Sequence, residues 1–300
     1  MINNMTTNIK KVRLCAFADE ASQSVEGQIT ALHRNGIDLL EVRGINGVNI
    51  SRLSDVDARE AAAAFKADGI KIWSIGSPIG KSSIDEAPVI QLEMLKRIAE
   101  LADIFETKNI RIFSFYDTDG IPTYKKKVIE RLGELAETAK ACGVTLCHEN
   151  EKGIWGENPE NCREIHKALP EIRCVFDPAN FVQCGVDVPE AWKKLRQYVY
   201  YGHIKDALSD GMVVPPGMGE GHLADYLPEY VGLASDVLTI EPHLAEFCGL
   251  KGLEKVHHSI MQNNVRFADN NEAFDFACDI FKKLLDRLQI NTENQIYDPK

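Results

Sequence analysis

The sequence predicts an α/β protein with a single-domain (β/α)8 TIM barrel fold. Short apolar runs alternate with longer amphipathic stretches from one end of the chain to the other. The length of 300 residues also suits one such barrel, which typically takes about 250 residues. No linker rich in Pro, Gly or Ser and no block of like charge divides the chain, so we expect one domain.

Eight short apolar runs are predicted to be the strands of the barrel. They are rich in β-branched and aromatic residues, as is typical of strands buried on both faces of a parallel sheet. The predicted strands are residues 12–17, 39–42, 70–75, 110–113, 144–147, 174–176, 199–204 and 237–240.

The stretches between these strands are predicted to be helices, because their apolar residues recur at intervals of three and four. Ser54 and Asn158-Pro159 are typical of helix starts, and Gly143 is typical of a helix end directly before a strand. A last helix is predicted over residues 274–288, where it either completes the outer ring of the barrel or joins a subunit interface. A homo-oligomer therefore stays possible.

We expect residues 1–10 to be a flexible N-terminal segment, residues 11–290 to form the barrel and residues 291–300 to be a polar C-terminal tail. The N-terminus has no apolar signal core, and no apolar run approaches the roughly 18 residues of a membrane span. The eight cysteines include no Cys-x-x-Cys pair, and several lie in apolar runs. This usage is typical of reduced thiols in a cytoplasmic protein.

The formal charge of −11 argues against a general nucleic-acid or anionic-membrane partner, because contact with phosphates needs a positive field. A local basic patch would escape this argument. Motifs for nucleotides and serine hydrolases are also missing: there is neither a G-x-G-x-x-G after the first strand nor a G-x-S-x-G. The glycine-rich run at residues 217–221 resembles a phosphate-binding loop, but it does not directly follow a strand.

Four consecutive predicted strands end in residues that bind hard metal ions. These residues are Glu149, Asp177, His203 and Glu241. Function in such barrels lies at the carboxyl ends of the strands, and three converging carboxylates repel one another unless a cation compensates them. We therefore predict a site for one divalent ion, which could be Mn²⁺, Mg²⁺, Co²⁺ or Zn²⁺. Taken singly, Asp177 could instead cap a helix and His203 could be a core histidine.

Further polar residues near the strand ends are candidates for substrate contacts. Lys205 lies two residues after His203 and so points to the same side of its strand. The other candidates, for which a surface or structural role is an open alternative, are Arg43 beside Glu41, Lys81, Asn180, His222 on the loop before the last strand, and His243. By the same alternation, His148 should point outward toward a helix.

Several segments resemble the sugar phosphate isomerase/epimerase family of the xylose isomerase-like TIM-barrel superfamily, which includes ketose 3-epimerases and inosose dehydratases. They are residues 148–150, 176–180, 202–206 and 240–243, together with residues 17–20 and 74–81 at early strand ends. The resemblance implies that Glu149, Asp177, His203 and Glu241 bind the metal. It also implies that Glu149 and Glu241 exchange the substrate proton from opposite faces. Asn180 departs from the family pattern, because those epimerases have a histidine there.

The leading hypothesis is therefore a metal-dependent isomerase or epimerase that moves a proton next to the carbonyl of a sugar or sugar derivative. A dehydratase or lyase acting on an inosose or keto-sugar would use the same site. A non-catalytic sugar-binding barrel is a further alternative. An endonuclease IV-like DNA repair enzyme fits poorly, since it needs several zinc ions and a basic surface.

Overall fold

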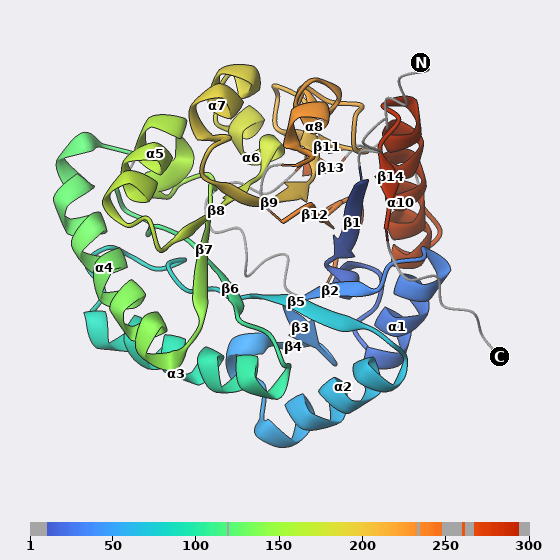
Figure 1. Cartoon of the computed structure of the whole chain (residues 1–300), viewed down its shortest axis with the longest axis horizontal. Helices are drawn as coiled ribbons and strands as arrows, with labels where there is room; N and C mark the ends of the chain where they lie inside the picture. The colour runs from blue at the N-terminus through green and yellow to red at the C-terminus, as the bar shows by residue number, and fades with distance from the viewer. Residues whose placement is uncertain (1–10, 119, 233–234, 248–259, 262–266, 294–300) are drawn as a thin grey trace, which may run out of the picture.

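The computed structural model describes residues 11–118, 120–232, 235–247, 260–261 and 267–293. The chain forms a closed barrel of eight parallel strands (Figure 1). The strands are ordered β12-β9-β8-β7-β6-β5-β2-β1, and pairing of β1 with β12 closes the ring. Their bounds are β1 Lys11–Ala16, β2 Leu39–Val42, β5 Lys71–Gly76, β6 Asn109–Ile112, β7 Thr145–Glu149, β8 Arg173–Phe176, β9 Val199–Ile204 and β12 Val237–Ile240. The (β/α)8 prediction is confirmed, and no strand end differs from its predicted position by more than two residues.

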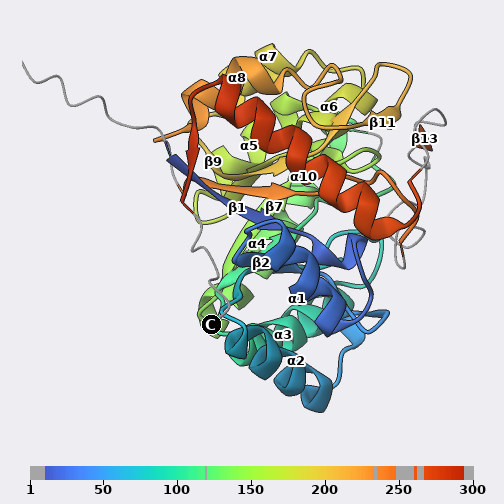
Figure 2. The same cartoon turned by 90° about the vertical axis from the view of Figure 1, so that its right-hand side faces the viewer.

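Helices surround this barrel (Figures 1 and 2). They are α1 Val25–Arg34, α2 Asp55–Ala67, α3 Pro88–Ile104, α4 Lys125–Cys142, α5 Pro159–Ala168, α6 Pro178–Gln183, α7 Val188–Leu195, α8 Leu223–Tyr230 and α10 Asn270–Arg287. The last helix lies beside the first, since Arg34 of α1 forms an ion pair with Asp275 of α10, and it thereby completes the outer ring. No helix within the described ranges is long and apolar enough to cross a membrane.

The predicted helix signals act as expected. The Ser54 side chain accepts a hydrogen bond from the Asp57 N–H at the start of α2, and Asn158 caps α5 in the same way. Gly143 ends α4 in the left-handed conformation, with φ of 73°. These caps satisfy backbone groups that the helix termini leave unpaired.

Short strands and 3-10 helices lie at the two ends of the barrel. β14 pairs in parallel with Lys11 and Val12 of β1, so the chain after α10 returns to the amino-terminal end of the barrel. Residues 1–10 and 294–300 of the predicted terminal segments lie outside the described ranges. The short elements are β3 Gly44–Ile45, β4 Val48–Asn49, β10 Asp206–Ala207, β11 Met212–Val214, β13 Ile260–Met261, β14 Asn291–Thr292, and the 3-10 helices η1 Ala18–Glu20, η2 Ile50–Arg52, η3 Pro122–Tyr124 and η4 Trp155–Glu157.

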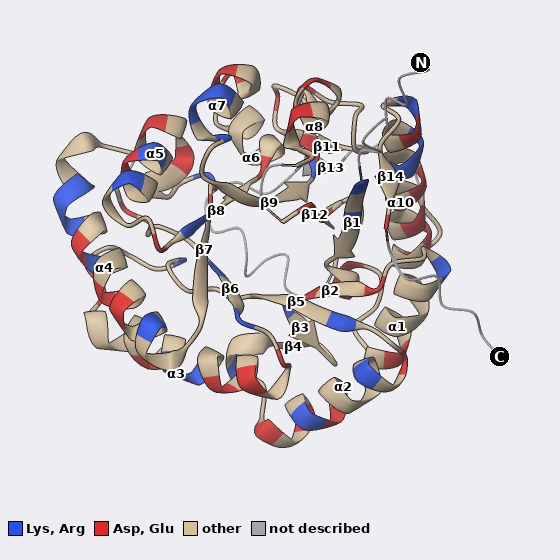
Figure 3. Ribbon diagram, viewed as in Figure 1, with Lys and Arg blue, Asp and Glu red and all other residues tan. Residues whose placement is uncertain are grey.

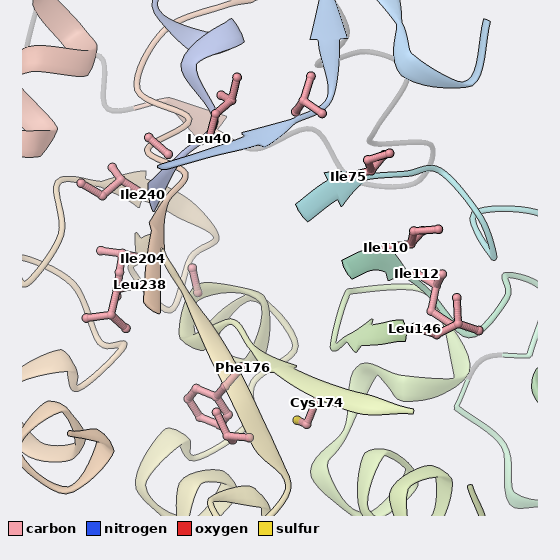
Figure 4. Packing of buried hydrophobic residues seen from close by; sticks show 14 of the residues in the cluster. Leu40, Ile75, Ile110, Ile112, Leu146, Cys174, Phe176, Ile204, Leu238 and Ile240 are labelled. Carbon is pink, nitrogen blue, oxygen red and sulfur yellow. The ribbon is translucent and has the colours of Figure 1, made fainter. Parts of the chain in front are cut away.

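Alternation along the strands separates the main apolar core from the polar interior of the barrel. Figure 4 shows buried side chains such as Ile204, Leu238 and Ile240 in the layer between strands and helices. Their sequence neighbours His203 and Thr239 must then point into the barrel. The cysteines that the structure describes are free, as predicted, and most of them are buried.

Candidate metal centre

The four predicted ligands lie together at the carboxyl end of the barrel. Glu149 ends β7, Asp177 follows β8, His203 belongs to β9 and Glu241 follows β12. One potential ligand atom from each residue lies within 4.8 Å of the other three. All four side chains are buried, with exposed fractions of 3% or less.

This cluster fits a divalent cation by its chemistry. His203 Nδ1 lies 3.0 Å from Glu149 Oε1 and 3.2 Å from Glu241 Oε2. Asp177 Oδ2 and Glu241 Oε2 are buried, and their nearest partners are the cationic groups Lys205 Nζ at 3.0 Å and His203 Nδ1 at 3.2 Å. Buried carboxylates require positive partners, and a bound metal ion would supply a further one. Three carboxylates and one imidazole form a donor set that Mn²⁺, Mg²⁺, Co²⁺ and Zn²⁺ accept.

The electrostatics of His203 reflect the same surplus of negative charge. Burial alone would lower the pKa of its imidazole. The carboxylates of Glu149 and Glu41 outweigh burial and raise the pKa well above its usual range. The cluster therefore attracts positive charge strongly at this point.

Asp177 is both a helix cap and a potential ligand. Its Oδ1 accepts a hydrogen bond of 3.0 Å from the backbone N–H of Asn180 at the start of α6. Its Oδ2 lies 3.0 Å from Lys205 Nζ. Burial raises the pKa of Asp177 to about 6 although Lys205 opposes this shift. The helix-cap alternative and the ligand prediction thus concern different oxygens of one carboxylate.

An arginine lies behind each of the two glutamates. Arg111 Nη1 donates to Glu149 Oε2 at 2.7 Å, and Arg43 Nη1 donates to Glu241 Oε1 at 2.9 Å. The remaining oxygen of each glutamate faces His203. Burial alone would raise both glutamate pKa values, but nearby cationic groups, including His203, outweigh it, so the pKa of each glutamate lies well below its usual range.

Sequence reasoning missed Arg111. It lies within β6, between two apolar residues, and not at a strand end where function was expected. The available signal was a charged residue in the middle of a short, otherwise apolar run. Such a residue inside a barrel needs a charged partner, because an isolated buried charge is costly.

Arg43 was predicted to contact substrate, but its donors are engaged within the protein. Nε and Nη2 bind the two oxygens of Asp19 at 3.0 and 2.9 Å, and Nη2 also lies 3.1 Å from Glu20 Oε1. The guanidinium carbon lies over the rings of Phe17 and Phe247 at 4.3 and 4.6 Å. The structure therefore places Arg43 as a support for Glu241.

Glu41, another candidate for a sugar contact, is fully buried behind His203. Its Oε2 lies 3.3 Å from His203 Nε2 and accepts a hydrogen bond of 3.0 Å from Thr239 Oγ1. Its Oε1 accepts a hydrogen bond of 2.9 Å from the Tyr201 hydroxyl. These contacts occupy both carboxylate oxygens.

Two further candidates touch the ligand cluster. Lys205 Nζ lies 3.0 Å from Asp177 Oδ2 and 3.7 Å from Glu241 Oε2, as expected from its alternation with His203. Asn180 Nδ2 donates to the Asn150 carbonyl at 2.9 Å and lies 3.3 Å from Glu149 Oε1.

Lys81 does not touch the four ligands but pairs with Glu151 at 3.0 Å, and its ammonium lies 4.4 Å from the centre of the Phe113 ring. Burial lowers the pKa of Lys81 in spite of the nearby carboxylate of Glu151. Glu151 lies two residues after Glu149 in the chain, so the Lys81–Glu151 pair lies at the same end of the barrel.

His243 belongs to a second acidic group beside the first. Its Nε2 lies 3.3 Å from Glu241 Oε1 and 3.4 Å from Glu20 Oε1, and its backbone N–H donates to Glu20 Oε2 at 2.7 Å. This group could also hold a cation by its ligand types. Arg43 bonds to both carboxylates of this group, and one of them, Glu241, also belongs to the first cluster.

Two candidate histidines lie outside the cluster. His222, expected near the site, lies at the start of α8, where its Nδ1 is 2.7 Å from Asp225 Oδ2 and its side chain is 47% exposed. His148 points away from the barrel interior, as alternation predicts, and its ring centre lies 5.7 Å from that of His166 in α5.

The glycine-rich run holds a carboxylate of the chain itself. The backbone N–H groups of Gly217, Gly219 and Gly221 donate to Asp206 at 2.9, 2.9 and 2.8 Å. A Cβ on Gly219 would lie 2.4 Å from Asp206 Oδ1, so glycine is required for this approach. The loop therefore binds a carboxylate of the chain itself and fixes the residue next to Lys205.

The fold and the site define a class of protein, the (β/α)8 barrel whose last four strands each end in a residue that could hold a metal ion. The chain belongs within it to the xylose isomerase-like TIM barrel family, whose model matches residues 29–228. This match confirms the superfamily to which the sequence segments pointed.

Several solved structures share this fold. One is an L-ribulose 3-epimerase, with 19% identity and a TM-score of 0.72 over 93% of this chain and 96% of that one. A second is the IolI protein with a bound zinc atom, with 18% identity and a TM-score of 0.71 over 92% and 99%. A third is the probable 3-DHS dehydratase AsbF of Bacillus anthracis, with 14% identity and a TM-score of 0.68 over 91% and 98%. A search of curated proteins finds no match.

Proposed function

We propose that this protein is a divalent-metal-dependent isomerase or epimerase that moves a proton next to the carbonyl of a sugar or sugar derivative. One observation carries the proposal: Glu149 and Glu241 come from strands β7 and β12, and both present an oxygen to His203 Nδ1 in a buried cluster. The IolI and L-ribulose 3-epimerase structures support a metal and a sugar substrate by similarity of fold.

The ion would be held by Glu149, Asp177, His203 and Glu241. When bound, it supplies Lewis-acid stabilisation of negative charge on a substrate oxygen. The protein supplies the base. Because the pKa values of Glu149 and Glu241 lie well below the usual range, both are ionised at neutral pH, the state that a base needs before it takes a proton.

The neighbours of the two glutamates would orient the substrate and the proton transfer. Arg111 and Arg43 each hold one oxygen of a glutamate, which fixes the direction of the other oxygen. Lys205 would offer a donor to a substrate oxygen beside the cluster, and Asn180 Oδ1, which accepts no hydrogen bond from the described residues, would offer an acceptor. His243 and Lys81 are the remaining proposed contacts, since both lie buried at this end of the barrel.

A dehydratase is the second candidate, and Asn180 favours it over a ketose 3-epimerase. Its amide is bound to Asn150 and Glu149, where those epimerases have an imidazole. The dehydratase AsbF also shares the fold. In this reaction a glutamate removes the proton in the same way, and a neighbouring hydroxyl leaves as water.

Incubation with ketoses, inososes and keto-glycosides in D₂O tests the proposal. With Mn²⁺ present, we expect deuterium at the carbon next to the carbonyl of a converted substrate, measured by NMR and mass spectrometry. An epimer as product supports the leading proposal, and loss of water supports the dehydratase. Glu241→Gln should lose the exchange, because an amide cannot act as the base.

The matched control is Glu130→Gln, which changes an exposed glutamate of α4 and should leave the exchange intact. Conversion of a substrate without incorporation of deuterium would overturn proton transfer in favour of a hydride shift. Binding of a sugar without conversion of any substrate would identify a non-catalytic sugar-binding barrel.

A further inference from the structure

A pocket lies at the opposite end of the barrel from the candidate metal centre. It has a volume of about 720 Å³ and lies between α2 and the first residues of strands β2 and β5. Pockets that bind small molecules typically have volumes of about 300–1,000 Å³. The amino-terminal end of the barrel therefore has room for a ligand of its own.

One face of helix α2 explains why this pocket is hollow and what charge it carries. Arg59, Ala62, Ala63 and Lys66 line the pocket, and their spacing of three, four and seven residues places them on one face of the helix. The two alanines extend no side chain beyond Cβ, so they leave space between the helix and the barrel. Arg59 and Lys66 lie at the two ends of this pair of alanines.

The charge of the pocket is opposite to that of the whole chain. Its charged lining consists of Arg13, Arg59, Lys66 and Lys71 against Glu106 alone, although the chain carries −11. Lys66 pairs with Glu106 at 2.6 Å. No carboxylate of the described residues forms an ion pair with the other three cations. Figure 3 shows basic positions on α2 and at the start of β5. Such a local field attracts anions.

The opposite wall of the pocket is aromatic. Arg13 lies over the face of Trp73, with its guanidinium carbon 5.6 Å from the ring centre. Trp73 in turn stacks on Tyr200, with ring centres 5.7 Å apart and an interplanar angle of 29°. Phe65 and Phe105 add further apolar lining. A flat aromatic group is therefore well matched to this wall.

We propose that this pocket binds a small anionic molecule with a flat aromatic part. Arg13, Arg59 and Lys71 would hold its anionic group. Its ring would lie between the alanine face of α2 and the aromatic wall. The site shares no residue with the metal centre, so its occupancy does not require the ion.

Equilibrium dialysis of the metal-loaded full chain against 2-naphthoate tests the proposal, with the neutral 2-naphthamide as a ligand of matched shape. We expect one saturable site for 2-naphthoate per chain and affinity at least about fivefold lower for the amide. Lys71→Gln should weaken binding of the anion about three- to fivefold, as expected for one partly exposed charge pair. Ala63→Trp, at an exposed helix position, should fill the pocket and abolish binding.

Lys126→Gln is the control, since this lysine is highly exposed on α4, and it should bind like the natural sequence. Treatment with a chelator should also leave binding unchanged. The proposal is overturned if the amide binds as well as the anion, if no saturable binding occurs, or if Lys71→Gln and Ala63→Trp both bind normally. Loss of binding on chelation would place the anion at the metal centre and would equally contradict it.

Discussion

Glu41 and His203 form a buried carboxylate–imidazole pair, with 3.3 Å between Glu41 Oε2 and His203 Nε2. The other ring nitrogen, Nδ1, faces Glu149 and Glu241. Partners of this kind fix the orientation and tautomer of a ligating histidine. In the proposed metal site, the pair would therefore leave Nδ1, and not Nε2, as the ligand nitrogen of His203.

Glu41→Gln should weaken binding of a divalent ion by about 10- to 100-fold, which is typical when such a partner is lost. The amide keeps the shape of the side chain, so the fold should persist. Competition titration with a zinc indicator measures the change. Glu60→Gln on the exposed surface of α2 is the control. Unchanged affinity in Glu41→Gln would show that His203 needs no such support.

Substitutions of Asp177 should separate its two roles. Asp177→Asn keeps an oxygen that can accept from the Asn180 N–H, whereas Asp177→Ala removes both the cap and the ligand. In chelator-treated protein, we expect the alanine variant to be less stable than the asparagine variant by about 1 kcal/mol. Added Zn²⁺ should raise the melting temperature of the natural sequence but of neither variant.

Thermal unfolding with and without Zn²⁺ gives both quantities. Asp225→Asn, at an exposed carboxylate of α8, should respond to Zn²⁺ like the natural sequence. A full Zn²⁺ response in Asp177→Asn would remove Asp177 from the ligand set.

Residues at strand ends could be predicted from sequence because their positions follow from local rules. Alternation places Lys205 beside His203, and the parallel order of the strands gathers Glu149, Asp177, His203 and Glu241 at one end. Those rules require only that the strands be recognised.

Contacts across the barrel could not be predicted in this way. Glu41 reaches His203 from β2 to β9, which are not neighbours in the sheet, so the contact depends on closure and twist of the barrel. Arg111 meets Glu149 through a side chain in mid-strand, where a charge in an apolar run indicates that a charged partner exists but not which residue it is. His222 follows a loop whose path is fixed by the bonds between Asp206 and the glycines.

Protonation of His166 should destabilise the protein at low pH. This side chain is 2% exposed and stacks on Tyr198, and burial lowers the pKa of His166 to about 4 although a hydrogen bond to the Ile172 carbonyl opposes the shift. In the unfolded chain a histidine titrates near 6.5. Between these values the unfolded state binds more protons, so stability is full above about pH 6.5 and falls as the pH decreases toward 4. The shift corresponds to a loss of at most about 3–4 kcal/mol.

Urea unfolding of chelator-treated protein at pH 7.5 and pH 5.0 measures this dependence. His166→Gln should be less stable at pH 7.5 because it alters a buried site. Its loss of stability between the two pH values should nevertheless be smaller than that of the natural sequence. An equal loss in both proteins would rule out His166 as a source of the acid sensitivity.

Two Gly→Ala substitutions should have opposite effects on stability. One is at Gly219, in the loop that binds Asp206, and the other is at Gly133, in helix α4. A Cβ on Gly219 would lie 2.4 Å from Asp206 Oδ1 and 2.5 Å from the Ala207 carbonyl oxygen, so Gly219→Ala must displace Asp206. We expect a loss of about 2 kcal/mol or more from this crowding. On Gly133 of α4, the nearest atom to a Cβ is Leu169 Cδ2 at 3.8 Å. Gly133→Ala should therefore stabilise the protein by about 0.5–1 kcal/mol, because alanine favours the helix. Urea unfolding of both variants compares them, and a Gly219→Ala variant as stable as Gly133→Ala would show that this loop does not hold Asp206 in place.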